Sequence, residues 1–257
     1  MDGIPARKPS VSVAEGSRVE LTDPTAPTWV GRGADKLTAA LDRFAPAGLT
    51  VLGRNCLDVG ASTGGFTQVL LHRGAGHVVA LDVGHGQLAP VLATDPRVTE
   101  LSGVNIRAVG TDPGSVRELG GPFDLLVADL SFISLCLVVE VLAALVDPRG
   151  DLVLLVKPQF EVGRERLGKG GIVRTAEHRL QAVHAVVDAA ASAGLRLRGL
   201  IRSPRQGAAG NQEYLGWWTP GTATGPSDPG ATSLLDDLAQ QETQAPRRPW
   251  NGRSGDR

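Results

Sequence analysis

Residues 56–67, which read CLDVGASTGGFT, decide the fold of this chain. A short apolar run that carries Asp58 breaks at Gly60 into a small, polar, glycine-rich turn, and apolar residues resume at helical spacing from Phe66. This pattern predicts a strand, a tight turn and the start of a helix. The glycines let the backbone take positive φ and approach a ligand closely, and free N–H groups at a helix start bind polar ligand atoms. We therefore expect the first β-α corner of a nucleotide-type site.

The ligand class follows from the spacing around this turn. The turn lacks the Gly-x-Gly-x-x-Gly spacing of dinucleotide sites. It resembles motif I of class I methyltransferases, Asp-x-Gly-x-(Ser/Thr)-x-Gly-Gly, whose ligand is S-adenosylmethionine (SAM). A second apolar run ends in Asp82, 24 positions after Asp58, close to the ~20 at which such folds place the acid that binds the ribose. The alternative is a glycine-rich corner without a ligand, and Asp82 argues against it.

Composition excludes several classes of protein. A chain of 257 residues, 42% hydrophobic and 21% charged, suits one main globular domain. The net charge of −1 gives no global basic field, so any RNA-binding face must be local. Cys56 and Cys136 fit core thiols rather than a disulfide framework or metal site, which favours a reducing cytoplasm. No apolar run approaches the ~18 residues of a membrane span, so we expect no membrane insertion.

Strands and helices alternate from residue 55 onward. Uninterrupted apolar strands in such an alternation predict an α/β fold, with a mostly parallel, seven-stranded, Rossmann-like sheet covered by helices on both faces. We expect strands at 55–59, 77–81, 98–101, 123–128, 152–156, 195–201 and 213–219, and helices at 65–73, up to about 145, and at 176–193.

Charged residues stand where the predicted strands end. Asp58, Asp82, Asp129 and Lys157 each close an apolar run, and in a parallel sheet these ends share the edge where ligands bind. A single acid there could be a helix cap, but a lysine is no N-cap. Lys36 is also unusual, because it lies in the first turn of a predicted amphipathic helix, where a cation opposes the helix dipole. A solvated surface lysine is the alternative for Lys36.

Six motifs stand in order along the chain and make a family resemblance specific: GRGADKL at 31–37, DVGASTGGF at 58–66, DLSFIS at 129–134, KPQFE at 157–161, GGIV at 170–173 and GNQEY at 210–214. The chain is similar to the TlyA family, often labelled hemolysins, which is related to the FtsJ-type ribosomal RNA 2′-O-methyltransferases. The resemblance covers about residues 3–220 and implies a class I methyltransferase fold and SAM-dependent 2′-O-methylation of cytidine in 16S and 23S ribosomal RNA. By motif, the family's catalytic set falls on Lys36, Asp129, Lys157 and Glu213.

The resemblance also implies a domain organisation. Residues 1–26 resemble only the final strands of the S4-type RNA-binding domain with which the family begins, 27–31 form a linker, and 32–220 form the methyltransferase domain. The family's linker reads Arg-x-Trp-Val, and here Pro27 replaces the arginine. Residues 221–257 are rich in Gly, Pro, Ser, Thr and Arg, so we expect a disordered tail with one short helical candidate at 233–241.

The chemistry assigns roles to these residues. A ribose 2′-hydroxyl must line up behind the methyl group and lose a proton, and positioning can supply ~7 to 11 kcal/mol. We expect Lys157 to orient that oxygen, Asp129 to hold Lys157, and Lys36 and Glu213 to complete the network. Whether Lys157 also accepts the proton stays open. The alternative is an ordinary buried ion-pair network.

Binding residues follow from position along the chain. For SAM we expect contacts from Asp58, Gly60, Ser62, Thr63 and Gly64, from Asp82 at the ribose, and from Asn105 at the adenine, although Asn105 reads equally well as a turn residue. For RNA we expect a local basic rim for phosphate contacts. Its candidates are Arg164, Arg166, Lys169, Arg174, Arg202 and Arg205.

Two rival functions remain at this stage. The first is a membrane-lytic hemolysin, but the sequence contains neither a basic amphipathic helix nor an apolar span that could act on lipid. A non-catalytic ribosome-binding protein fits the shortened S4 portion, but it has no need of charges at strand ends. The nucleotide modified, the choice between free ribosomal RNA and assembled ribosomal subunits, and the oligomeric state stay open.

Overall fold

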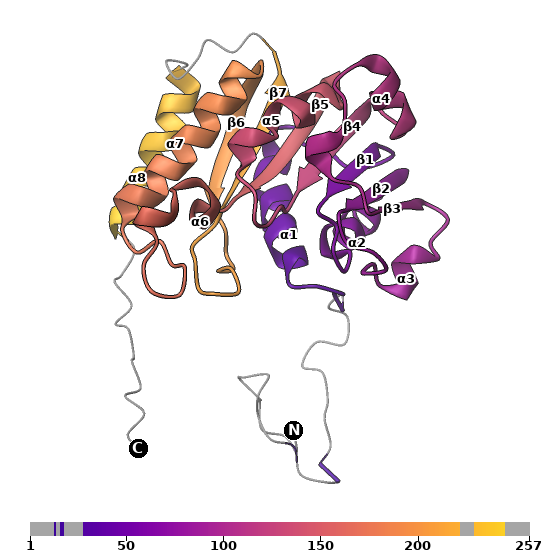
Figure 1. Cartoon of the computed structure of the whole chain (residues 1–257), viewed down its shortest axis with the longest axis horizontal. Helices are drawn as coiled ribbons and strands as arrows, with labels where there is room; N and C mark the ends of the chain where they lie inside the picture. The colour runs from indigo at the N-terminus through magenta and orange to yellow at the C-terminus, as the bar shows by residue number, and fades with distance from the viewer. Residues whose placement is uncertain (1–12, 14–15, 18–27, 222–228, 245–257) are drawn as a thin grey trace.

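A computed structural model describes residues 13, 16–17, 28–221 and 229–244. Within them, seven strands form one sheet in the order β3-β2-β1-β4-β5-β7-β6 (Figure 1). Neighbours from β3 to β5 are parallel, and β7 runs antiparallel to both β5 and β6. The predicted mostly parallel sheet is confirmed. The strands are β1 (Asn55–Val59), β2 (His77–Asp82), β3 (Val98–Ser102), β4 (Phe123–Ala128), β5 (Val146–Val156), β6 (Leu195–Arg202) and β7 (Tyr214–Pro220).

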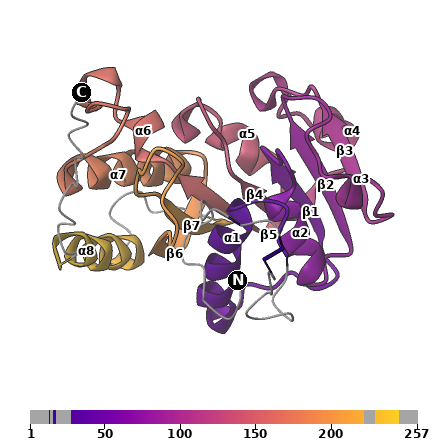
Figure 2. The ribbon, with the colours of Figure 1, turned by 90° about the horizontal axis from the view of Figure 1, so that it is seen from below.

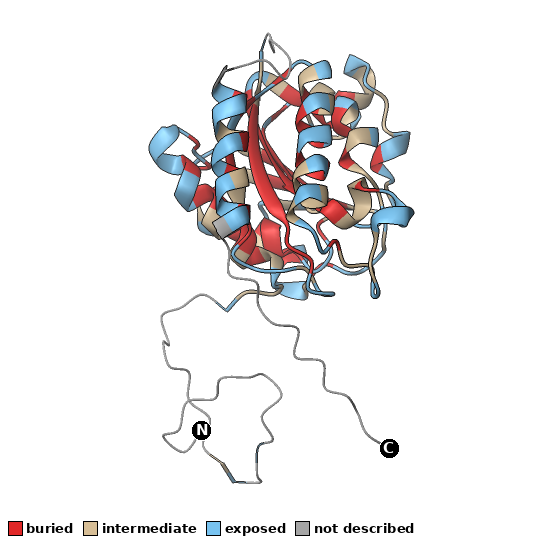
Figure 3. Ribbon diagram, turned by 90° about the vertical axis from the view of Figure 1, so that its left-hand side faces the viewer, coloured by how far each residue is buried: buried red, intermediate tan, exposed pale blue. Residues whose placement is uncertain are grey.

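Helices cover both faces of the sheet (Figures 2 and 3). One face packs against α1 (Gly33–Phe44), α2 (Gly65–His72) and α3 (Pro90–Ala93). The other face packs against α4 (Pro113–Glu118), α5 (Val139–Ala144), α7 (Ala176–Ser192) and α8 (Pro229–Gln244). Shorter turns of helix are η1 (Ala45–Ala47), η2 (Ile106–Ala108), η3 (Leu135–Leu137), α6 (Pro158–Glu161) and η4 (Arg164–Arg166).

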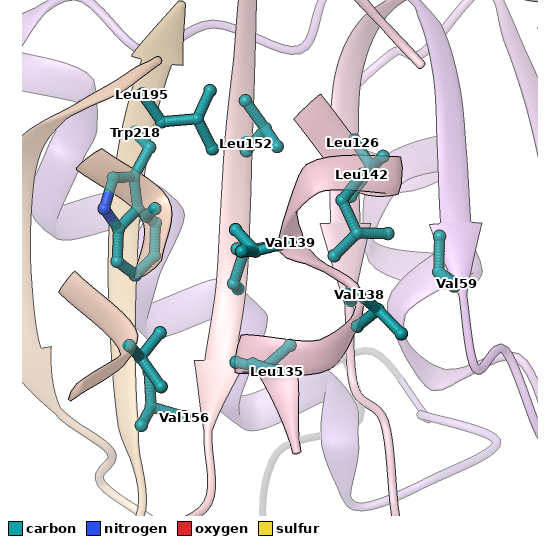
Figure 4. Close-up of a cluster of buried hydrophobic side chains, with 14 of the residues drawn as sticks. Val59, Leu126, Leu135, Val138, Val139, Leu142, Leu152, Val156, Leu195 and Trp218 are labelled. Carbon is teal, nitrogen blue, oxygen red and sulfur yellow. The ribbon is translucent and has the colours of Figure 1, made fainter. Parts of the chain in front are cut away.

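The central strands are apolar throughout because each one contributes side chains to two hydrophobic cores, one on each face of the sheet. In β5, Leu152, Leu154 and Val156 point into the core under α5 and α7, whereas Val153 and Leu155 point into the core under α1 and α2. Side chains alternate between the faces of a strand, so a strand covered on both faces is apolar throughout. Figure 4 shows one core, in which β5, β7 and α5 enclose fully buried side chains.

The structure corrects the sequence reading at the C-terminus. Residues 229–244 are not a disordered tail: they form α8, which is longer than the candidate at 233–241 and packs on the sheet. Three buried residues, Ala231, Leu235 and Leu238, form its apolar stripe at i, i+4 and i+7. Three apolar residues leave the composition of this segment largely polar, and a prediction from composition alone therefore gave a disordered tail. A second correction is that β5 begins at Val146 instead of 152.

Some expectations concern residues that the structure does not describe. The predicted S4 remnant at 1–26 lies almost entirely outside the described residues, as do 222–228 and 245–257. Across the described part of the chain, no helix has both the length and the apolar character needed to cross a membrane.

Candidate active site

The predicted charged residues meet at one edge of the sheet. Asp82 is the last residue of β2, and Asp129 and Lys157 directly follow β4 and β5. Glu213 directly precedes β7, and because β7 is antiparallel to β5, its start lies at the carboxyl end of β5. Lys36 reaches this edge from the first turn of α1.

Four of these side chains form two buried ion pairs. Lys36 Nζ lies 2.6 Å from Glu213 Oε2, and Lys157 Nζ lies 2.6 Å from Asp129 Oδ1. Lys157 also donates to Ser131 Oγ at 2.7 Å. Both lysines are at most 8% exposed, although lysine is almost never this buried without a partner. Glu213 thus provides the charge that compensates for Lys36 near the positive end of the α1 dipole.

Further contacts join the two pairs. Gln159, two residues after Lys157, donates its amide to Glu213 Oε1 at 3.3 Å. Gly33 begins α1 so close to the other pair that a Cβ there would lie 3.4 Å from Asp129 Oδ2. The start of α1 and the segment after β5 therefore bracket both pairs. The sequence reading missed Gln159 and Ser131 as site residues, although both stand inside the motifs.

An aromatic surface borders the Lys157 pair. Phe132 is 93% exposed, takes a left-handed φ of +63°, and its ring centroid lies 5.4 Å from that of Phe160. The Phe160 ring in turn lies 5.9 Å from Lys157 Nζ. A bulky residue at positive φ is an outlier that clusters at functional sites. The aromatic residue within DLSFIS was the available sequence signal for this surface.

Glu161 ties the loop after β4 to the segment after β5. Its carboxylate accepts hydrogen bonds from the hydroxyl of Ser134, from the Leu135 N–H at 2.8 Å and from the Cys136 thiol at 3.5 Å. Burial, and then the negative charge of Glu161, raise the pKa of Cys136 to about 11. Cys136 is therefore a protonated packing thiol at neutral pH, in line with the sequence reading.

The glycine turn forms the corner beside this cluster. Gly60 has φ +83°, and a Cβ there would lie 2.8 Å from the Asp129 carbonyl oxygen, so a larger residue would push the β4 loop away. Ser62 takes a φ of +49° and donates its N–H to Asp82 Oδ2 at 2.8 Å. Gly64, at φ +93°, packs against Leu88 and Leu92.

Asp58 differs from the other predicted cofactor residues because it is fully buried. Thr67 Oγ1 donates to its Oδ2 at 2.6 Å, and Oδ1 has no hydrogen-bond partner. Desolvation raises the pKa of Asp58 to about 7, with Asp129 and Asp82 adding to the rise and the Thr67 hydrogen bond opposing it. A buried acceptor without a partner is rare and indicates a ligand or an ordered water.

A polar hollow lies next to the turn. Asp82 contributes to it, with its Oδ1 held by the Gly84 N–H at 2.7 Å. Asn105 is not among the lining residues: its Oδ1 accepts the Arg107 N–H and caps η2, which agrees with the turn alternative. Four of the polar lining residues escaped the sequence reading. The pairing of Ala80 with Glu100 and of Asp82 with Ser102 in the sheet explains the place of two of them. The polar lining consists of Ser62, Asp82, Gly84, Gln87, Glu100 and Ser102.

The described part of the linker contacts the same turn. Val30 N–H donates to Gln68 Oε1 at 2.7 Å, and Gln68 Nε2 donates to the Thr28 carbonyl at 3.1 Å. A Cβ on Gly31 would lie 2.7 Å from Thr63 Oγ1. The linker therefore packs on the glycine turn although Pro27 replaces the family's arginine.

The predicted RNA residues fall into two groups. Arg164, Arg166, Lys169 and Arg174 are exposed on residues 163–174, which we call the rim loop. By contrast, Arg202 Nε lies 3.2 Å from the buried Glu242, and Arg205, although exposed, pairs with Asp35 at 2.6 Å. Figure 1 shows the loops before α7 and before β7 at the lower edge, near α6.

The residues present suit SAM. Its cationic groups match the partnerless oxygen of Asp58, and its ribose hydroxyls match the carboxylate in the polar hollow. A sheet covered on both faces, a glycine turn after β1 and an acid closing β2 define a class I SAM-dependent methyltransferase. Aeropyrum pernix fibrillarin with bound SAM shares this fold, with a TM-score of 0.50 at 16% identity over 73% of this chain and 76% of that chain.

The family follows from the sequence comparisons. The FtsJ-like methyltransferase family matches residues 29–219. The 16S/23S rRNA (cytidine-2'-O)-methyltransferase TlyA of Mycobacterium tuberculosis is 48% identical over 217 residues, which span 84% of this chain and 78% of that protein. A hemolysin-named structure from Lactococcus lactis has a TM-score of 0.73 at 34% identity over 84% of this chain and 99% of that chain. This chain belongs to the FtsJ-like methyltransferase family, and SAM is its cofactor.

Proposed function

We propose that this enzyme methylates the ribose 2′-hydroxyl of a cytidine in ribosomal RNA. In this proposal Lys157 and Asp129 act on the hydroxyl, and Lys36 and Glu213 support them. The observation that carries the proposal is the Lys157 ammonium, fixed by Asp129 and Ser131 beside an exposed aromatic ring. The 48% identity to a relative named for cytidine 2′-O-methylation supports the same substrate. A ribosomal substrate also implies a cytoplasmic location.

The chain's residues would act mainly by positioning. SAM, when bound, supplies a methyl group on a positively charged sulfur. Lys157 donates a hydrogen bond to the 2′-oxygen and fixes its direction, because Asp129 and Ser131 hold the ammonium from two other sides. Such alignment is worth ~7 to 11 kcal/mol. Because the Lys157 ammonium has no lone pair to accept it, the hydroxyl proton passes to the Asp129 carboxylate beside that ammonium.

The second ion pair supports the first. The Glu213 side chain is 2% exposed, against 20% for Asp129, and Gln159 links Glu213 to the Lys157 segment. We assign this pair to holding α1 and the β7 start in register, so that the pocket keeps its shape. On the cofactor side, the glycine turn lets the backbone approach SAM closely through Gly60, Ser62, Thr63 and Gly64. Asp58 compensates the positive charge of SAM, and Asp82 binds its ribose.

The aromatic surface fits a nucleic-acid substrate. A base taken out of a stack binds well on an exposed aromatic ring, worth ~1 to 3 kcal/mol per base. Phe132 is almost fully exposed, and the Phe160 ring lies tilted against it. The basic residues of the rim loop then contact phosphates, which fixes the register of the strand without reading its sequence.

One assay tests the function. Tritiated SAM is incubated with deproteinised ribosomal RNA and, separately, with isolated ribosomal subunits, and the modified ribose is mapped by its resistance to alkaline cleavage. We expect label at a cytidine 2′-oxygen with the wild type and none with Lys157→Ala. Binding without transfer would instead indicate a non-catalytic ribosome-binding protein, and lysis of lipid vesicles would indicate a hemolysin.

A further inference from the structure

Helix α8 lies beyond the part of the chain that matches the family. The match ends at residue 219, and α8 begins at Pro229, yet it packs its apolar stripe against the sheet and α7. Near its end stands Glu242, whose side chain is 0% exposed. A glutamate is almost never fully buried unless it is paired, so this carboxylate has a specific task.

Glu242 binds two arginines from different elements. Arg179 of α7 donates from Nε at 3.0 Å and from Nη2 to Glu242 Oε2, and Arg202 Nε lies 3.2 Å from Oε1. The Arg179 Nε also reaches the hydroxyl of Tyr214 at 3.2 Å, on the strand that follows Glu213. α8 is therefore joined by ion pairs to α7 and β6, and Arg179 extends this link by a hydrogen bond to β7.

The far end of the Arg179 fork holds the rim loop. Its Nη1 donates to the carbonyls of Val173 at 3.3 Å and Arg174 at 2.9 Å. Asn211, two residues before Glu213, holds the same segment by accepting the Val173 N–H and by donating to the Gly171 carbonyl, both at 2.9 Å. Two side chains thus fix the loop's last residues, and one of them depends on Glu242.

We propose that Glu242 of α8 is a positioning residue for RNA: it holds Arg179, and Arg179 holds the rim loop in the conformation that meets the substrate. The inference rests on the proposed function, because it makes RNA the ligand of that loop. Removing the carboxylate leaves two partly buried guanidinium groups without a counter-ion. Arg179 then turns to solvent, and the Val173 and Arg174 carbonyls lose their donor.

The test compares Glu242→Gln with Asp236→Asn, which removes the same charge from an exposed position on the same helix. Amide hydrogen exchange is followed at Gly168, Gly171 and Val173, whose N–H groups are bonded within the held loop, and at Gly60 as an internal reference. We expect exchange at least ~10-fold faster in the loop and unchanged at Gly60, since local opening is independent of the rest of the fold. Asp236→Asn should match the wild type.

Kinetics on ribosomal RNA give the second readout. For Glu242→Gln we expect KM for RNA to rise by ~10-fold and the salt dependence of binding to weaken by about one phosphate contact, with kcat and the SAM dissociation constant within about a factor of two. Glu242→Asp, which keeps the charge, should recover most of the loss. If the wild type does not methylate RNA but Glu242→Gln still shows faster amide exchange in the rim loop, the proposed function is rejected and the link from Glu242 to the loop is kept.

Two results would overturn the inference. One is loop exchange in Glu242→Gln equal to that in Asp236→Asn. The other is a fall in kcat and SAM affinity with no change in KM for RNA, which a general loosening of the fold would give. Should Glu242→Gln not fold, Arg179→Lys answers the same question, because a lysine keeps a cation beside Glu242 but cannot reach both carbonyls.

Discussion

Buried ion pairs lie at both ends of the sheet's parallel strands, at the amino ends (the amino edge) and at the carboxyl ends (the carboxyl edge). The two edges differ in what surrounds these pairs. At the amino edge, Arg54 pairs with Asp151, whose other oxygen accepts the Trp217 indole N–H at 2.6 Å. Arg54 also donates to the Asp124 carbonyl at 3.2 Å. Both oxygens of Asp151 thus have partners inside the protein.

The carboxyl edge is built differently. Beside its ion pairs stand a carboxylate oxygen of Asp58 with no partner, an exposed Phe132 at positive φ and a polar hollow around Asp82. Buried charge alone therefore does not mark an active site, since structural pairs also occur. A buried carboxylate oxygen without a partner and an exposed aromatic residue at positive φ beside the ion pairs distinguish the functional edge from the structural one.

The strongest way to sharpen this contrast is Lys157→Ala. We expect methyl transfer to fall by ~10³-fold or more, since both positioning and proton handling are lost. SAM binding, measured by calorimetry, should stay within about a factor of two. Wild-type turnover by this variant would remove Lys157 from the mechanism.

Arg54→Ala is the counterpart at the amino edge. It leaves Asp151 buried without its cation, so we expect the free energy of unfolding to drop by ~3 kcal/mol in chemical denaturation. Transfer per folded molecule should not change. A variant of normal stability but low kcat would break the proposed division between the edges.

Asp82→Ala tests the cofactor hollow. Loss of a charged hydrogen-bond acceptor, worth ~2 kcal/mol, should weaken SAM binding ~30-fold. Asp95→Ala removes a half-buried acid that pairs with Arg97 and serves as the control. An unchanged dissociation constant for Asp82→Ala would place the ribose contact elsewhere.

The smallest effect concerns the proton on Asp58. Burial raises the pKa of Asp58 to about 7. The contribution of this carboxyl to the free energy of unfolding is therefore present at low pH and is lost as pH rises from about 4 to about 7. A cationic ligand favours the ionised form, so SAM binding at pH 7 should release about half a proton. Calorimetry in buffers of different ionisation enthalpy measures this. Asp58→Asn should show no release, and equal release from both proteins would exclude Asp58.

Local patterns in the sequence predicted much of this molecule. The strand at 55–59 and the lysine after 152–156 were found because a strand covered on both faces is apolar until it ends. The partners of those residues could not be found in the same way. Gln159 with Glu213, and Glu242 with Arg179, are joined only by packing between elements remote in sequence. The inward turn of Arg202 was hidden for the same reason, because a surface arginine and a paired one look alike in sequence.

The Lys36–Glu213 contact joins residues 177 positions apart, from the first helix and from the strand added between β5 and β6. No partial chain that stops before β7 can form it. Since chains are synthesised from the N-terminus, Lys36 of α1 has no Glu213 to pair with until nearly the whole sheet has been made. A chain that stops before Glu213 and β7 therefore lacks one member of the set of four residues proposed for methyl transfer.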